Sequence, residues 1–327
     1  MEQRHLGTDG LSVSAVGLGC MGLSQAYGAA DDDESIATIR RAMDLGVSLL
    51  DTAMSYGAGH NEQLVGRAIA GRREQVVLAT KFGITRDPDG VRLDGRPEHV
   101  RGYCDASLTR LGVDAIDLYY LHRVDPDVPL ADTVGAMAEL VEQGKVRHLG
   151  LSEVNAGQLE QAAAVHPITA VQLEWSLFWR EPEDDVIPAA RRLGIGVVPY
   201  SPLGRGILTG ALPSSGFGSG DFRANDPRFA GVDLTRNLAL VDALRHLAEE
   251  RGASPGQLAL AWLLAQGADV VPIPGTRSAH RVAENAAAAA LELSPTGLAR
   301  IEQIAPRSAW TGDRFSFAAH HTTRTTT

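Results

Sequence analysis

The 327-residue chain contains few cysteines and few aromatic residues, and it has no long apolar run. Its two cysteines, Cys20 and Cys104, form no metal-ligand pattern, so the sequence predicts neither a metal site nor structural disulfides, as is typical of a reducing cytosol. No apolar run reaches the ~18 residues of a membrane-spanning helix, and the first residues lack the hydrophobic core of a signal peptide. We therefore expect a soluble, cytoplasmic protein.

Positive charge is also in deficit, since the formal net charge is -10. An acidic protein is repelled by nucleic acid and by anionic membranes, so neither is an expected partner. Any phosphate group must be bound by a local cluster of cations. With 44% hydrophobic residues the chain can bury a large core, and its length suits either two domains or one α/β barrel.

Polar residues follow three apolar, strand-like segments at the point where each segment ends. Asp51 ends the first such segment, Lys81 ends the second and His122 follows the third, while Tyr56 lies in the loop after Asp51. Because the carboxyl ends of parallel strands meet at one edge of a sheet, we expect these four side chains to lie together.

These four residue types can perform acid catalysis on a carbonyl group. A tyrosine with an ordinary pKa of about 10 is a poor proton donor at neutral pH, but a buried ammonium beside it lowers that pKa. Lys81 would lower the pKa of Tyr56, Asp51 would keep Lys81 protonated, and His122 would orient the substrate carbonyl.

Each residue also has a purely structural interpretation. Asp51 can cap the following helix, Lys81 can be a solvated strand end, and Tyr56 and His122 can be satisfied core groups. The occurrence of all four at successive strand ends favours the catalytic interpretation.

Strand-like and helix-like segments alternate along the chain after a hairpin at residues 4–14. Alternation of this kind requires parallel strands with right-handed crossovers, and eight units favour a closed (β/α)₈ TIM barrel over an open sheet. We predict a single domain over residues 1–327, with the barrel at about 15–305 and a C-terminal tail at about 306–327. The predicted strands are 15–19, 47–51, 76–81, 116–121, 146–151, 170–173, 196–198 and 270–273.

Two segments interrupt the alternation. Residues 203–233, after the seventh strand, are too long for a simple turn, and we predict a mobile lid in preference to plain disorder. In the tail, Trp310, Phe315 and Phe317 are expected to approach the site, whereas the polar end at 320–327 is expected to fray.

An ordered series of motifs makes the sequence resemble the aldo-keto reductase family, from about residue 4 to about residue 305. The resemblance implies a barrel that binds NADPH across the strand ends and reduces aldehydes or ketones by hydride transfer. It also implies Tyr56 as the general acid, Lys81 and Asp51 as its tuning pair, and His122 as the carbonyl-orienting group. The motifs are Asp51-Thr52-Ala53-x-x-Tyr56-Gly57 with Asn61-Glu62, Lys81-Phe82-Gly83, Asp117-Leu118-Tyr119 before His122, Gly150-Leu151-Ser152, Tyr200-Ser201-Pro202-Leu203-Gly204-Arg205-Gly206, and Ile273-Pro274-Gly275-Thr276-Arg277 with Glu284-Asn285.

The resemblance further implies which residues bind the cofactor. Ser152 and Gln172 would hold the nicotinamide carboxamide, and Tyr200 would stack on the nicotinamide. The turn that begins at Ser201 would bind the diphosphate through backbone N–H groups, and Glu284 and Asn285 would meet the adenine. The full set is Met21, Ser152, Glu153, Gln172, Tyr200, Ser201, Leu203, Gly204, Arg205, Gly206, Gly275, Thr276, Arg277, Arg281, Glu284 and Asn285.

Two positions depart from the family pattern. Glu153 stands where the best-known branches have Asn, and a carboxylate can accept the carboxamide N–H₂ but cannot donate to its carbonyl. Gly275 stands where many relatives have Lys against the adenosine phosphate. Because Arg277 lies two residues on and Arg281 matches the family's phosphate-binding Arg, the cation is displaced and not lost, and we predict NADPH as the cofactor. Either both arginines face the 2′-phosphate, or Arg277 points to solvent and only Arg281 contacts it.

The predicted substrate pocket is mostly apolar. Its walls are assigned to Met21, Tyr27, Phe82, Arg123, Trp175 and the segment 203–233. This composition favours an aldehyde or ketone with an aromatic or aliphatic body, although Arg123 could receive a carboxylate. We predict a broad-specificity carbonyl reductase that acts as a monomer or homo-oligomer.

Two other functions stay open at this point. A barrel of this family can act as a cofactor-sensing subunit with little turnover, as in the potassium-channel β subunits, and the same four residues would then be present. A lyase or aldolase could use Lys81 as a Schiff base, but Asp51 and Tyr56 would then have little role, and no second lysine lies nearby to depress the pKa of Lys81.

Overall fold

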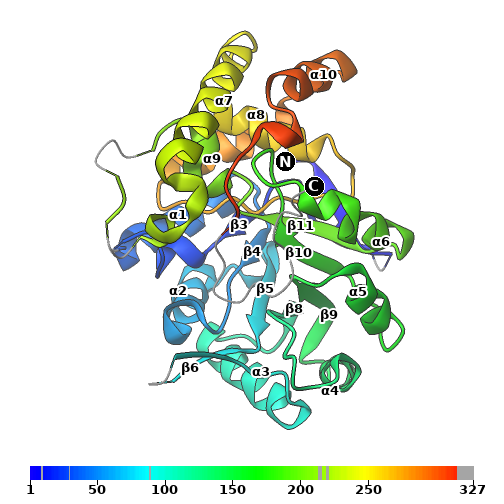
Figure 1. The fold of residues 1–327 in the computed structure, drawn as a ribbon. Coiled ribbons are helices and arrows are strands. Elements are labelled where there is room, and N and C mark those ends of the chain that lie inside the picture. Colours follow the sequence, from blue (N-terminus) through cyan, green and yellow to red (C-terminus); the bar gives the residue numbers. More distant parts are fainter. Residues whose placement is uncertain (9, 29, 88–89, 213–215, 219–220, 315–327) are drawn as a thin grey trace.

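A computed structural model describes residues 1–8, 10–28, 30–87, 90–212, 216–218 and 221–314. Within these ranges, seven parallel strands form the central sheet, and they lie side by side in the order in which they occur along the chain. Helices surround the sheet (Figure 1). This is the (β/α)₈ barrel predicted above. The strands are β3 (Leu18–Gly19), β4 (Leu49–Asp51), β5 (Val77–Phe82), β8 (Ile116–Leu121), β9 (Val146–Ser152), β10 (Ala170–Glu174) and β11 (Gly196–Tyr200).

The predicted eighth strand, at 270–273, closes the barrel without forming a regular strand. The N–H of Val271 donates to Val197 of β11 (2.9 Å), and the N–H of Gly17, beside β3, donates to Pro272 (2.9 Å). Proline has no N–H, and a second proline follows two residues later, so the segment cannot form a continuous ladder. It still joins the two edges of the sheet.

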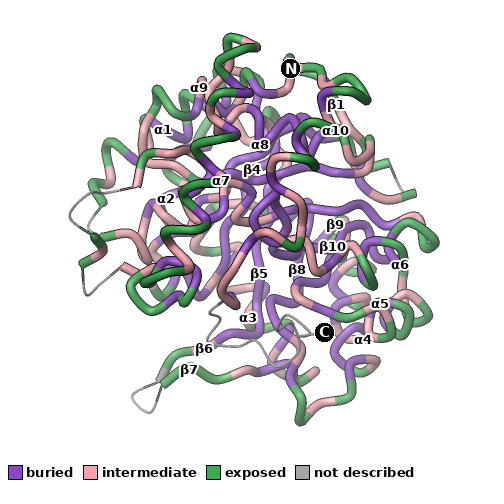
Figure 2. Tube along the Cα trace, turned by 45° about the horizontal axis from the view of Figure 1, so that its top comes forward, coloured by how far each residue is buried: buried purple, intermediate pink, exposed green. Residues whose placement is uncertain are grey.

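Helices cover the outside of the barrel, and buried residues concentrate inside it (Figures 1 and 2). Their starts follow from local sequence: Asn155 and Ser254 form capping boxes, and Asp31 caps a helix whose first turn holds three acids. Within the described ranges, no helix has both the length and the apolar character that a membrane crossing requires. The helices are α1 (Asp32–Asp44), α2 (His60–Ile69), α3 (Pro97–Leu111), α4 (Leu130–Glu142), α5 (Ala156–Ala163), α6 (Val186–Arg192), α7 (Gly231–Glu249), α8 (Pro255–Leu264), α9 (Ala279–Ala287) and α10 (Pro295–Ile304).

The predicted N-terminal hairpin is present and covers the amino-terminal end of the barrel. Its strands are β1 (Gln3–Leu6) and β2 (Leu11–Ser14). The fully buried Leu6 packs on the first residue of β11, Gly196, where an added Cβ would lie 2.5 Å from the leucine side chain. Because this end is covered, a ligand site is expected at the carboxyl ends of the strands.

Two elements were not predicted. One is the hairpin of β6 (Ile84–Asp87) and β7 (Gly90–Leu93), which follows β5, and the other is α10, which packs on α7. The hairpin could have been predicted from the sequence Asp-Pro-Asp-Gly at 87–90, which is typical of a turn. The hairpin extends the wall beside the strand ends.

The described part of the long segment 203–233 contains three 3₁₀ helices before α7 begins at Gly231: Gly204–Thr209, Phe222–Asn225 and Pro227–Phe229. Asp221 forms a β-bridge with Tyr27, and the N–H of Phe222 donates to Ala26 (3.1 Å), so this segment meets the loop that follows β3. The predicted mobility stays a prediction.

In the C-terminal tail, Trp310 is buried with its ring 5.2 Å from that of Phe178. Phe315, Phe317 and the polar end at 320–327 lie outside the described residues.

Candidate active site

The structure brings the four predicted catalytic residues together at the strand ends. The ammonium of Lys81 donates to the carboxylate of Asp51, to the backbone oxygen of Thr52 (2.8 Å) and to the hydroxyl of Tyr56 (3.3 Å). The ring of His122 lies edge-on to the Tyr56 ring, with 5.8 Å between centroids. All four side chains are buried. The ammonium of Lys81 therefore links the carboxylate of Asp51 to the phenol of Tyr56, beside His122.

The loop after β4 turns sharply to place Tyr56 beside Lys81. Gly57 and Ala58 have φ values of +56° and +53°, in the left-handed region, where a Cβ is unfavourable. Thr52 Oγ1 donates to the buried Asn61 (2.6 Å), which holds the loop against α2. Asn61 in the family motif thus has a structural role here.

Burial raises the pKa of Tyr56, because the phenolate is disfavoured out of water, and the attraction of Lys81 offsets only part of this effect. The expected net decrease in this pKa is therefore wrong. For Lys81, burial alone would lower the pKa, but the carboxylate of Asp51 and the oxygen of Tyr56 outweigh burial and raise it. At neutral pH the phenol carries its proton and the lysine its charge, as a general acid and its partner require.

Burial, together with the positive charges of Arg123 and Lys81, holds the pKa of His122 well below its ordinary value. The imidazole is neutral at physiological pH and lines the cavity described next. A neutral imidazole donates one hydrogen bond, which suits the orientation of a carbonyl oxygen.

A cavity of about 1070 Å³ runs across the strand ends, which is the volume of a ligand larger than most drug-sized molecules. Tyr56 and His122 line it near the catalytic lysine, and Arg281 and Asn285 line it at α9. Most predicted site residues lie on this cavity: Met21, Tyr27, Asp51, Tyr56, His122, Arg123, Ser152, Gln172, Tyr200, Ser201, Leu203, Arg205, Gly206, Gly275, Thr276, Arg277, Arg281, Glu284 and Asn285.

Gln172 and Ser152 present complementary hydrogen-bonding groups to this cavity. The side-chain N–H₂ of Gln172 donates to Asp51 Oδ2 (2.7 Å), which leaves its Oε1 as an acceptor. Ser152 Oγ accepts from Arg123 Nη1 (3.1 Å), so its own proton is free to donate. One acceptor and one donor match the N–H₂ and C=O of a carboxamide. The residues present therefore fit a nicotinamide.

Arg277 and Arg281, at the other end, have different surroundings. Arg277 Nη2 donates to the backbone oxygen of Tyr27 (2.6 Å) and Nη1 to that of Gly28 (3.5 Å), which ties the loop after β3 to the segment before α9. Arg281 is exposed, and its guanidinium has no partner among the described residues. Arg281 is thus the cation available to a phosphate, whereas Arg277 already holds a loop.

Glu153 lies outside the cavity, contrary to the prediction that it binds the cofactor. Its carboxylate forms an ion pair with Arg314 of the C-terminal tail and accepts the N–H of Glu174 (3.0 Å). The backbone at Glu153 has a φ of +55°, which turns the chain at the end of β9. Sequence could not reveal this pairing, because Arg314 lies 161 residues away.

Phe82 and Trp175 also lie off the cavity, contrary to their assignment to the substrate pocket. Phe82 follows Lys81 on a strand and so points to the opposite face, where it stacks on Tyr119 at 5.0 Å. The indole N–H of Trp175 donates to Glu183 (2.9 Å), within the outer layer. Gly204 is covered too, since an added Cβ there would lie 2.9 Å from the Phe178 ring.

Several cavity residues were missed from the sequence. They come from the loop after β3 and from the unpredicted β6–β7 hairpin, so knowledge of the tertiary contacts was needed to find them. The missed residues include Gln25, Ile84 and Arg86. Phe222 and Arg223 also line the cavity, and they lie in the segment 203–233 that the sequence analysis assigned to the pocket wall.

Behind Tyr200 lies a buried cluster of three acids and three arginines, here called the acid–arginine cluster. Arg228 Nη1 donates to Glu174 Oε1 (2.6 Å) and its Nη2 donates to Asp226 Oδ2 (2.7 Å). Arg205 lies 3.3 Å from Glu174 Oε2. Through these contacts the long segment is fixed to the end of β10. The members are Glu153, Glu174, Arg205, Asp226, Arg228 and Arg314.

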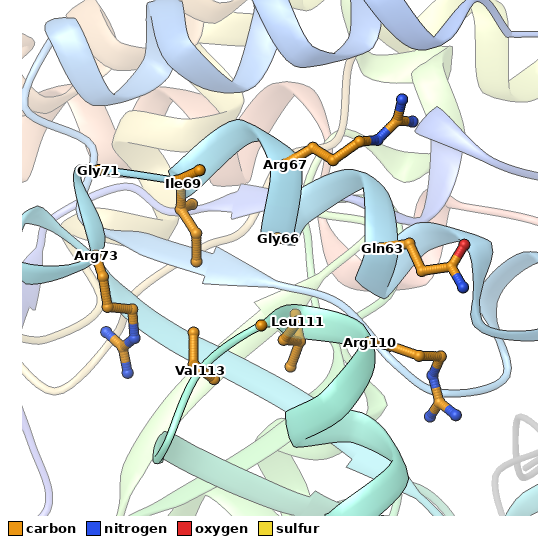
Figure 3. Close-up of a pocket in the computed structure, with 11 residues that line it drawn as sticks. Gln63, Gly66, Arg67, Ile69, Gly71, Arg73, Arg110, Leu111 and Val113 are labelled. Carbon is orange, nitrogen blue, oxygen red and sulfur yellow. The ribbon is translucent and has the colours of Figure 1, made fainter.

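A second, smaller pocket of about 440 Å³ lies on the outside of the barrel between α2 and α3 (Figure 3). Arg67, Arg73 and Arg110 line it, and each forms an ion pair with a carboxylate. None of the four catalytic candidates lies on it. The chemistry therefore belongs to the larger cavity.

The sequence is similar to known proteins over nearly its whole length. The model of the aldo/keto reductase family matches residues 15–306. A protein described as probable aldo-keto reductase 1 of Glycine max is 44% identical over 319 residues, which cover 97% of this chain and 92% of that protein.

Among solved structures, a glycerol dehydrogenase of Gluconobacter oxydans superposes with a TM-score of 0.87 at 32% identity, covering 97% of this chain and 99% of that one. An aldo/keto reductase of Klebsiella pneumoniae, in complex with NADP and acetate, superposes with a TM-score of 0.73 at 29% identity, covering 94% and 96% of the two chains.

Proposed function

This chain belongs to the aldo/keto reductase family, and from that premise we propose that it reduces aldehydes or ketones to alcohols with NADPH. The observation that carries the proposal is the ammonium of Lys81, which bridges Asp51 and Tyr56 beside His122 at a cavity of about 1070 Å³. The NADP-bound neighbour from Klebsiella pneumoniae supports the choice of cofactor.

In the proposed reaction, Ser152 and Gln172 would hold the nicotinamide of NADPH, which would supply a hydride for the carbonyl carbon. Tyr56 donates its proton to the carbonyl oxygen, so one carbonyl, one NADPH and one proton give one alcohol and one NADP⁺. His122 holds the oxygen in place by a hydrogen bond. Lys81 stabilises the tyrosinate that forms, and Asp51 keeps Lys81 charged.

The hydrogen bonds of Lys81 argue against the Schiff-base alternative. A nucleophilic amine needs a free lone pair, whereas Lys81 donates to three acceptors and has a raised pKa. The sequence contains only one other lysine, Lys145, which pairs with Asp105. Borohydride trapping with a carbonyl substrate, followed by mass spectrometry of the two lysine peptides, is expected to find neither modified.

An NADPH oxidation assay separates a reductase from a cofactor sensor. With a panel of aldehydes and ketones, we expect continuous turnover and one alcohol formed for each NADPH consumed. The alcohol is quantified by chromatography and NADPH by its absorbance. Tight NADPH binding with no alcohol from any carbonyl would contradict the proposed reaction and favour the sensor.

Cofactor selectivity is expected to depend on Arg281 more than on Arg277. One charge-assisted contact to the 2′-phosphate contributes roughly 1.5–3 kcal/mol, so Arg281→Ala should weaken NADPH binding roughly tenfold to a hundredfold and leave NADH binding nearly unchanged. Arg277 donates to the oxygens of Tyr27 and Gly28, so Arg277→Ala should change the affinities for both cofactors in parallel. Fluorescence titration of each variant with NADPH and NADH measures this.

Arg251→Ala is the matched control, because it also removes one arginine but at a position outside the cavity. Its affinities for NADPH and NADH should stay at the wild-type values. A selective loss of NADPH affinity in Arg277→Ala, with Arg281→Ala unaffected, would assign the phosphate contact to Arg277.

A further inference from the structure

We propose that the preferred substrates are carbonyl compounds that carry a carboxylate next to the carbonyl group, such as short 2-oxo acids, and that Arg123 binds this carboxylate. The inference rests on the proposed carbonyl reduction and deepens it. It replaces the apolar pocket predicted from the sequence, because two of the apolar residues assigned to that pocket, Phe82 and Trp175, lie elsewhere.

Arg123 is a buried cation without a carboxylate of its own. The residue is 8% exposed and lines the cavity next to His122. Its Nη1 donates to His122 O (2.6 Å) and Ser152 Oγ (3.1 Å), whereas Nη2 donates to no acceptor within the described ranges. A buried charge is normally paired. Glu153, whose carboxylate interacts electrostatically with Arg123, is already engaged by Arg314.

The remaining charges around this end of the cavity also favour an anion. Arg86, on β6, is exposed at the cavity wall and forms no ion pair with a described residue. Two acids line this part of the cavity, and each forms an ion pair. Asp51, among the catalytic groups, pairs with Lys81, and Asp221, in the long segment, pairs with Arg223. The catalytic end therefore has unpaired positive charge and no unpaired acid among the residues that line it.

A carboxylate beside the carbonyl would pair with the buried guanidinium of Arg123 and would balance the positive charge at the catalytic end of the cavity. It would accept from Arg123 Nη2 while the carbonyl oxygen faces His122 and Tyr56, and Arg86 would attract the anion toward the cavity mouth. An uncharged substrate of the same shape leaves the guanidinium unpaired. A site that hydrogen-bonds a polar group discriminates strongly against the analogue that lacks it.

The test compares 2-oxo-2-phenylacetate with its methyl ester, which has the same skeleton without the charge. For Arg123→Gln we expect kcat/KM for the acid to fall roughly tenfold to a hundredfold, mainly through KM, while kcat/KM for the ester changes less than about threefold. Intrinsic reactivity cancels in the ratio of variant to wild type. Arg101→Gln on the exposed face of α3 removes the same charge and should change neither substrate.

Equal losses for acid and ester in Arg123→Gln, or a wild type that reduces the ester and not the acid, would overturn the proposal. Equal losses with a weakened NADPH affinity would show instead that Arg123 positions the cofactor through Ser152. If the enzyme consumes NADPH with neither of these compounds and with no neutral aldehyde, the proposed carbonyl reduction itself is wrong, and not only the proposed preference for carboxylates.

The wild type offers a second test that does not depend on the folding of a variant. Phenylacetate is expected to compete with an aldehyde substrate at least about tenfold more tightly than phenylacetamide, because one charge-assisted contact is lost in the amide. Equal inhibition by the two compounds would contradict a carboxylate site at Arg123.

Discussion

Replacing Tyr56 by Phe is expected to lower kcat at least ~100-fold, the usual contribution of a positioned general acid. The change removes the proton donor and little volume, and the Lys81–Asp51 ion pair stays in place. NADPH affinity should change little, because the predicted cofactor contacts lie on other residues. Steady-state kinetics with a reactive aldehyde and a fluorescence titration of NADPH measure the two quantities separately.

Tyr103→Phe is the matched control. The hydroxyl of Tyr103 donates its proton to the carboxylate of Asp94, and Tyr103 does not line the cavity. Its kcat should stay at the wild-type value. Wild-type turnover in Tyr56→Phe would remove this residue from the mechanism.

Glu174→Gln is expected to lower the free energy of unfolding by about 3–5 kcal/mol at pH 7, the usual cost of breaking a buried ion pair. Glu174 faces Arg205 and Arg228 and is 1% exposed. The substitution keeps the shape of the side chain and removes its charge, so the arginines of the acid–arginine cluster outnumber its acids. Denaturant unfolding followed by circular dichroism measures the loss.

The same contact predicts how stability depends on pH. Burial opposes the charge of Glu174, but the arginines outweigh burial and lower its pKa from 4.5 to about 2 in the folded state. A carboxylate with a depressed folded pKa stabilises the protein above its unfolded pKa and loses this contribution as pH falls through the folded value. The difference between wild type and Glu174→Gln should therefore shrink as pH falls from about 4.5 to about 2.

Glu250→Gln is the control for this prediction, because Glu250 pairs with Arg300 at the surface, where ion pairs contribute little. Its stability should stay close to that of the wild type. A pH-independent difference between wild type and Glu174→Gln would show that Glu174 acts through packing and not through its charge.

The barrel and the catalytic group were predictable because both depend on short-range sequence patterns. Alternation of strands and helices makes the strands parallel, and their carboxyl ends then lie at the same edge of the sheet. Asp51, Lys81 and His122 could therefore be placed together without a structure. The hairpin at the amino-terminal end was predictable from its turn residues.

The parts that failed depend on contacts between distant segments or on the direction of a side chain. Phe82 was misassigned because adjacent residues of a strand point to opposite faces. Glu153 was misassigned because its partner, Arg314, comes from the tail. The pKa of Tyr56 was misjudged because the extent of burial cannot be read from a motif. These are tertiary properties that local sequence does not encode.

Deuterium transfer tests the central claim most directly. The wild type is incubated with NADPH that carries deuterium at the transferable position and with an aldehyde, and the alcohol is analysed by mass spectrometry. We predict one deuterium at the carbinol carbon for each NADPH consumed, and almost none in the same time with Tyr56→Phe at saturating cofactor. NADPH binding without any deuterated alcohol in the wild type, or equal transfer by the variant, would contradict the account.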